Sequence, residues 1–307
     1  SERAGGGEIV LKAENLQRTG SFKVRGATNK LAALGDAAAR GVVAGSAGNH
    51  AWAVALAARQ RGVRCEVIMP PHAPLGKVEG CRELGAQVSE GGDTVDACVA
   101  LARERAAETG MAFIHPFDDA DVVAGQGTLG LELLDQVPDL RKVIVCVGGG
   151  GLAAGTAIAV KSARPTVEIV GVQAEVVAAF PPSLAAGHPV EIAGATTIAD
   201  GIALKRPGDI TLPLVQRWVD GIVTVGEDDI AEAMVLLMER AKLVVEGGGA
   251  VGVAALLTGA VAPAAEGTTC VVLSGGNVDT GLLAPVARRH ETLLGRRLAL
   301  FTRIPDR

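Results

Sequence analysis

The chain has 307 residues, of which 49% are hydrophobic and 21% charged, a composition typical of a globular protein with a sizeable buried core. Its net charge is −5 and it has no basic block, which argues against nucleic acid as a partner. No basic-then-apolar leader is found and the five cysteines form no CxxC pair, so we expect a cytoplasmic protein with free thiols and neither zinc nor disulfides.

Short apolar segments predict β-strands that alternate with helices along nearly the whole chain. After a strand at 9–14, the predicted strands are residues 41–45, 65–69, 111–114, 142–147, 167–173, 222–225 and 268–273. Helices are expected beside them, for example at 50–60 and 75–84. Such alternation is typical of parallel sheets covered on both faces by helices.

Residues 11–27, LKAENLQRTGSFKVRGA, are the most informative stretch. A predicted strand leads into a polar turn, and Ser21-Phe22-Lys23 opens a helix. A lysine beside the free amides of a helix start has its ammonium form disfavoured, which lowers its pKa and suits a Schiff-base lysine. A solvated surface lysine is the alternative interpretation of this residue taken alone.

The next polar turn is Ser46-Ala47-Gly48-Asn49-His50, directly after the strand at 41–45. Free amides at the helix that follows can hold a carboxylate. Ordinary turn and capping chemistry would also favour serine and asparagine here.

The third segment, VCVGGGGLAAG at 145–155, brings four glycines to the end of a strand. Glycines let the backbone approach a phosphate closely and point amides at it. The same run can be interpreted as a dinucleotide fingerprint, with Glu168 or Glu175 as the ribose-binding acid about 20 residues on.

The stretch 247–265 is uncharged and about long enough to cross a bilayer. It begins with three glycines and contains Pro263, so we expect a glycine turn and a buried helix, not a membrane span. Near the end of the chain, VVLSGGNVD at 271–279 places Ser274 after a strand, where its hydroxyl can bond a ring nitrogen without supplying charge.

Together these segments resemble the fold-type-II pyridoxal-phosphate enzymes, specifically threonine and serine dehydratases (threonine ammonia-lyases) and the related serine racemases. The matching stretches are KAENLQRTGSFKVRGA, SAGNHAWAVALAAR, AFIHPFDDADVVAGQGTLGLEL, VGGGGLAAGTAIAVKS, IADGIAL, VVEGGGAVGVAALL and LSGGNVD. They occur in family order over nearly the whole chain. A dinucleotide site would leave the lysine segment and SGGN unexplained.

The resemblance implies pyridoxal 5′-phosphate as cofactor, with Lys23 as its Schiff-base partner and as the base at Cα. It also implies that Phe22 packs beside the ring, that Asn49 bonds the ring's 3′ oxygen and that Ser274 faces the pyridine nitrogen. The implied phosphate cradle consists of Gly148, Gly149, Gly150, Gly151 and Leu152. The substrate carboxylate is expected at Ser46, Ala47, Asn49 and His50, largely through backbone amides.

The implied fold is that of the tryptophan synthase β-subunit-like enzymes, an α/β fold with two parallel-sheet domains. We expect a large cofactor domain from residues 1–40 and 119–300, and a small mobile domain from 41–118. Residues 301–307 resemble the start of a C-terminal regulatory module.

Two departures from the family distinguish this chain. Racemases place a second serine in a Ser-Ser-Gly-Asn-His motif, on the cofactor face opposite the lysine, whereas this chain has Ala47. Without that hydroxyl, inversion at Cα lacks its second acid, which favours elimination. Racemases also carry a glutamate and an aspartate as divalent-metal ligands where this chain has Gln173 and Ala179, so we expect no divalent metal.

The predicted function is therefore dehydration of a small hydroxy amino acid, threonine or serine, with release of ammonia and 2-oxobutanoate or pyruvate. The resemblance places this reaction in amino-acid metabolism, including isoleucine biosynthesis, and implies a homodimer or homotetramer. A serine racemase-like isomerase is the alternative within the family. A cofactor- or dinucleotide-binding module without turnover is the alternative from another class.

Overall fold

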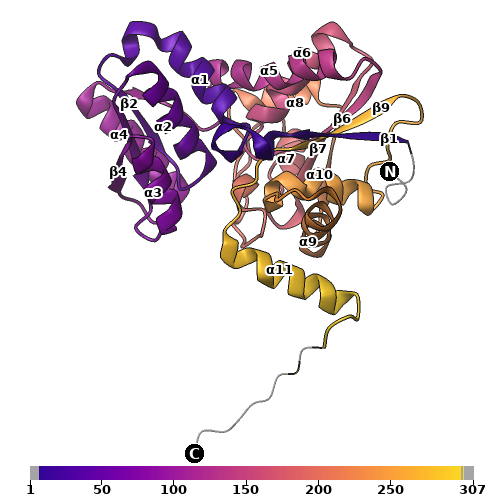
Figure 1. Cartoon of the computed structure of the whole chain (residues 1–307). Helices are drawn as coiled ribbons and strands as arrows, with labels where there is room; N and C mark the ends of the chain where they lie inside the picture. Colours follow the sequence, from indigo (N-terminus) through magenta and orange to yellow (C-terminus); the bar gives the residue numbers. More distant parts are fainter. Residues whose placement is uncertain (1–6, 299, 301–307) are drawn as a thin grey trace, which may run out of the picture.

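A computed structural model describes residues 7–298 and 300 of the chain. Within them, two parallel sheets carry helices on their faces, as the sequence predicts (Figure 1). The predicted regulatory segment 301–307 lies outside the described residues.

The larger sheet has five strands in the order β1-β9-β6-β7-β8, and every neighbouring pair is parallel. Their bounds are Glu8–Ala13 for β1, Thr268–Leu273 for β9, Leu140–Cys146 for β6, Glu168–Ala174 for β7 and Gly221–Val225 for β8. All six residues of β9 and all but one of β6 are buried. This agrees with the near-continuous apolar strands that a doubly covered parallel sheet requires.

The second sheet has the order β4-β3-β2-β5, again with parallel pairs. Its strands are Gln87–Glu90 for β4, Cys65–Met69 for β3, Val42–Gly45 for β2 and Ala112–Phe113 for β5. All four therefore lie within the segment 41–118, the predicted small domain. Its mobility as a separate domain stays a prediction.

The helices follow the strands in the expected alternation. In the first part of the chain they are α1 Lys23–Leu34, α2 Asn49–Arg61, α3 Leu75–Glu83, α4 Val95–Thr109 and α5 Ala120–Gln136. In the second part they are α6 Gly151–Ala163, α7 Phe180–Ala186, α8 Thr211–Trp218, α9 Glu227–Leu236, α10 Gly247–Leu257 and α11 Thr280–Leu293.

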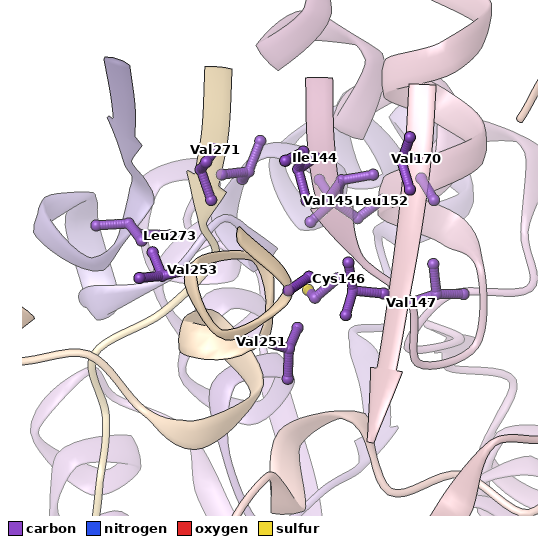
Figure 2. Packing of buried hydrophobic residues seen from close by; sticks show 14 of the residues in the cluster. Ile144, Val145, Cys146, Val147, Leu152, Val170, Val251, Val253, Val271 and Leu273 are labelled. Atoms are coloured by element: carbon purple, nitrogen blue, oxygen red, sulfur yellow. The ribbon is translucent and has the colours of Figure 1, made fainter. Parts of the chain in front are cut away.

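Small residues allow close packing in a chain that has few aromatics. A Cβ added at Gly155 of α6 would lie 2.3 Å from the carbonyl oxygen of Val123 in α5, so these helices can touch only because this residue is glycine. Figure 2 shows valines of α10 in one buried cluster with side chains of β6, β7 and β9. The uncharged segment from Gly247 is thus a buried core helix, as predicted. Among the described residues, no helix combines the length and apolar character that a membrane crossing needs.

Candidate active site

The turn before α1 is joined to the turn after β9, which brings the lysine segment to the SGGN segment. The amide of Phe22 donates to the carbonyl of Ser274 at 3.0 Å, and the amide of Gly276 donates to Gly20 at 2.9 Å. Ser21 and Gly275 form an antiparallel bridge between these bonds. Two segments from opposite ends of the chain therefore meet where the strands of the larger sheet end.

Lys23 is the first residue of α1, and its amine is desolvated. Its Nζ donates to the carbonyl of Pro116 at 2.7 Å. Burial lowers the pKa of Lys23 from 10.5 to about 8, an effect that the nearby Cys146 and Glu246 partly offset. The pKa falls as predicted, but the main cause is burial of the amine and not the helix start. An amine with this pKa is neutral in part of the population at physiological pH, as a nucleophile or base must be.

The glycine-rich loop follows β6 and opens α6. Gly150 has φ of +94°, a conformation that L side chains rarely adopt. A Cβ at Gly149 would lie 2.3 Å from the ring of Phe117, so no larger residue fits there. Within residues 7–298 and 300, the N–H groups of Gly148, Gly149 and Gly150 donate to no backbone carbonyl. The loop thus offers free amides beside a helix N-terminus, as a phosphate cradle requires.

Leu152 differs in role from the glycines of this loop. Its side chain is 5% exposed and belongs to the hydrophobic core. It therefore contributes to the predicted cradle only through its backbone.

Asn49 begins α2, beside the second sheet, and connects this helix to two loops outside the segment 41–118. Its Nδ2 donates to Glu246 Oε1 at 2.8 Å, and its Oδ1 accepts from Asn277 Nδ2 at 2.8 Å. The Asn277 amide also donates to the carbonyl of Thr19 at 2.6 Å. The orientation of the Asn49 amide is therefore set by its neighbours.

The carboxylate-binding turn at 46–50 uses its side chains in different ways. Ser46 Oγ accepts from the amide of Gly48 at 3.2 Å and so shapes the turn. His50 Nε2 bonds the carbonyl of Ile114 at 2.9 Å, and burial lowers the pKa of His50 to about 3. The neutral His50 ring is thus engaged in the interior. The backbone amide of His50 makes no bond to another backbone group in the described residues, so it can meet the predicted carboxylate.

Ser274 is 2% exposed, and its carbonyl is bonded by the amide of Phe22, the residue before Lys23. Burial raises the pKa of the nearby Cys146 thiol to about 11, and the Ser274 side chain partly offsets that rise. Phe22 lies beside the lysine, with its ring centroid 5.3 Å from Lys23 Nζ. The groups around the amine are therefore neutral ones, apart from Glu246.

Two of the described groups at this site received no role from the sequence. Glu246 is 6% exposed, and burial, with the nearby Asp200, raises its pKa to about 7. The segment 115–118 also contributes, because the Pro116 carbonyl faces Lys23 and the Phe117 ring faces Gly149. A feature of the sequence could have pointed to Glu246, because it is the last charged residue before the uncharged stretch 247–265.

At the two positions where racemases carry metal ligands, this chain has one residue that hydrogen-bonds other protein groups and one that is apolar. Gln173 donates to the Val147 carbonyl at 3.0 Å and accepts from the Phe180 amide at 3.0 Å, while Ala179 is buried. In the described part of the chain, no group of three or more His, Cys, Asp or Glu residues is arranged to hold a metal ion. That the protein uses no divalent metal stays a prediction.

Comparison with known proteins agrees with this geometry. The family model described as "Pyridoxal-phosphate dependent enzyme" matches residues 1–275. The chain belongs to this family. The described residues also fit the cofactor. The desolvated amine of Lys23 contacts the segment 115–118, and the glycine loop with its free amides packs against the same segment.

Individual relatives of this pyridoxal-phosphate enzyme cover most of its length. The L-threonine ammonia-lyase of Thermotoga maritima is 46% identical over 303 residues, which are 98% of this chain and 75% of the relative. The processed form of threonine deaminase isoform 2 from Solanum lycopersicum is 35% identical, with a TM-score of 0.88 and coverage of 93% of this chain and 84% of the deaminase. Maize serine racemase is 35% identical, with a TM-score of 0.87 and coverage of 96% of this chain and 91% of the racemase.

Proposed function

We propose that this chain is a threonine dehydratase that also accepts serine. Threonine would lose its Cα proton and its β-hydroxyl as water, and the released enamine would be hydrolysed to 2-oxobutanoate and ammonia. Serine would give pyruvate in the same way. The observation that supports this most strongly is the buried amine of Lys23, whose pKa of about 8 suits it to take the Cα proton.

When bound, pyridoxal phosphate supplies the electron sink that stabilises negative charge at Cα. The amides of Gly148–Gly151 would hold its phosphate and Asn49 its 3′ oxygen. Ser274, a neutral hydroxyl, would face the ring nitrogen without a charge to keep a proton there. A weaker sink favours prompt loss of a β-hydroxyl over reactions that need a long-lived carbanion.

The substrate carboxylate would bind at the turn 46–50, at the start of α2. Ala47 in this turn has no hydroxyl with which to protonate Cα from the face opposite Lys23. Elimination needs no such proton, whereas racemisation does. This residue favours the dehydratase over the racemase, although a racemase is among the structural relatives.

The experiment combines turnover with site mapping. The holoenzyme should produce 2-oxobutanoate from threonine, and borohydride should fix the cofactor to the Lys23 peptide. Lys23→Ala should lose both the label and turnover. Lys30→Ala, on the same helix, should keep the label on Lys23. A label on another lysine would refute the site, and cofactor uptake without turnover would favour a binding-only protein.

We further propose a cytoplasmic homodimer or homotetramer. All five cysteines are buried and free, as expected where thiols stay reduced. Leu16 and Leu131 are exposed by 71% and 58%, which an interface between subunits would explain.

A further inference from the structure

Two carbonyl groups of the glycine-rich loop are held from outside by buried side chains. Gln173 Nε2 donates to the carbonyl of Val147 at 3.0 Å, and Thr211 Oγ1 donates to the carbonyl of Gly149 at 2.5 Å. Gln173 is 1% exposed and Thr211 is fully buried. These bonds come from β7 and from the start of α8, so neither belongs to the loop's own helix.

Because a peptide group is planar, a hydrogen bond that fixes the direction of a carbonyl also fixes the direction of the N–H that follows it. In a trans peptide the C=O and the following N–H point in opposite directions, and the described residues contain no cis peptide bond. The Gly148 N–H therefore points away from Gln173, and the Gly150 N–H points away from Thr211. Within residues 7–298 and 300, neither N–H donates to a backbone carbonyl. Both N–H groups are therefore free to donate to a ligand, and a phosphate oxygen would be a strong acceptor.

The surroundings force each of these side chains to be the donor. The Gln173 Oε1 accepts from the amide of Phe180 at 3.0 Å, so its nitrogen faces Val147. The Thr211 hydroxyl oxygen accepts from the amide of Gly208 at 3.2 Å, so its proton is free for the Gly149 carbonyl. The Phe180 ring also packs here, 2.7 Å from where a Cβ on Gly150 would lie.

We propose that Gln173 and Thr211 are positioning residues that aim the amides of Gly148 and Gly150 at the cofactor phosphate. This rests on the assignment of the phosphate to Gly148–Gly151 under the proposed function. It also gives Gln173 a task that a carboxylate cannot perform. An amide donates directly to a carbonyl, whereas an ionised carboxylate opposite a carbonyl needs a cation between them.

The test compares pyridoxal phosphate with pyridoxal, which lacks the phosphate, in equilibrium binding to the cofactor-free protein followed by absorbance. Gln173→Met and Thr211→Val remove the donors and nearly keep the volume. Each should raise the Kd for pyridoxal phosphate about tenfold, the effect of one lost hydrogen bond, and change the Kd for pyridoxal less than about twofold.

Conservative variants separate the donor role from packing. Thr211→Ser keeps the hydroxyl and should stay within about twofold of the parent Kd. Gln173→Glu, tested with chelator, keeps an acceptor for the Phe180 amide but can donate to Val147 only while its carboxyl is protonated, so its Kd for pyridoxal phosphate should rise with pH relative to that of the parent.

The inference is refuted if either donor-removing variant binds pyridoxal phosphate like the parent. It is also refuted if affinity for pyridoxal falls equally, because the side chain would then support the site in general. If Thr211→Val does not fold, the two Gln173 variants decide. Failure of the proposed function would look different, since threonine turnover or the Lys23 label would be lost in the parent protein itself.

Discussion

Lys23 shows how a single residue combines function with a cost in stability. Its ammonium form is desolvated in the folded protein, and its carbonyl partner on Pro116 carries no full charge. Below pH 8 the folded state holds this buried charge. Above the unfolded pKa of 10.5 the amine is neutral in both states and the cost is absent. The stability contributed by this site should therefore rise with pH between 8 and 10.5.

We predict that Lys23→Met stabilises the cofactor-free protein against urea at pH 7 by about 3 kcal/mol, the energy equivalent of the fall in pKa from 10.5 to about 8. The gain should shrink toward zero as the pH approaches 10.5. Lys205→Met, at an exposed lysine, serves as the control and should change the unfolding free energy little at either pH. A Lys23→Met protein less stable than its parent at pH 7 would contradict the argument.

Ala47 allows a second prediction at the scale of one atom. Ala47→Ser adds a hydroxyl at a turn position where serine is well tolerated. A positioned proton donor contributes about 10²–10⁴-fold, so D-serine formation should become detectable while pyruvate formation persists. Chiral chromatography of serine incubated with each variant measures this. If the parent already racemises serine as fast as it forms pyruvate, Ala47 does not set the reaction.

At the scale of elements, Asp118 caps α8 from a segment that follows the second sheet. Its Oδ1 accepts from the amides of Ile210 and Thr211 at 2.8 and 3.1 Å, and its Oδ2 accepts from that of Asp209 at 3.0 Å. The same helix start holds Thr211 against the glycine loop. The cap thus connects the crossing segment, α8 and the loop.

Asp118→Ala should lower the free energy of unfolding by about 1–2 kcal/mol, as for other lost caps, because three amides lose their acceptor. Asp209→Ala is a matched control on the same helix start, since it removes only an exposed ion pair with Arg206. Urea unfolding of both variants measures the difference. If both variants lowered the free energy of unfolding equally, Asp118 would contribute no more stability than an exposed charged residue does.

In the whole molecule, the candidate site depends on contacts between the segment that forms the second sheet and the rest of the chain. Asn49 of α2 bonds Glu246 and Asn277, and Pro116 accepts from Lys23. Each contact joins the segment 41–118 to the rest of the chain. The expected closure of a small domain over a larger one would act directly on the lysine and on the Asn49 amide.

We expect the holoenzyme to be a dimer or tetramer in light scattering at micromolar concentration. Exposed Leu16 and Leu131 support this, and their replacement by Glu should weaken association without changing the far-UV spectrum. A monomeric parent protein would contradict the expectation.

The alternation of strands and helices, and the family, can both be inferred from the sequence alone. The strand predicted at 65–69 is β3, and the predicted helix at 75–84 is α3 to within one residue. Strand positions can be predicted because buried parallel strands consist of consecutive apolar residues, and because glycine and serine turns mark where such strands end.

The surroundings of Lys23, by contrast, depend on contacts between segments that are far apart in the sequence. The partners in its bond to Pro116 are 93 residues apart, those of Asn49 and Glu246 are 197 apart, and those of Asn49 and Asn277 are 228 apart. The local pattern of apolar and polar residues cannot specify such pairs, because it indicates whether a segment is a helix or a strand and not which distant segment packs against it. Burial, which lowers the lysine pKa and raises that of Glu246, likewise exists only once these distant segments have packed together.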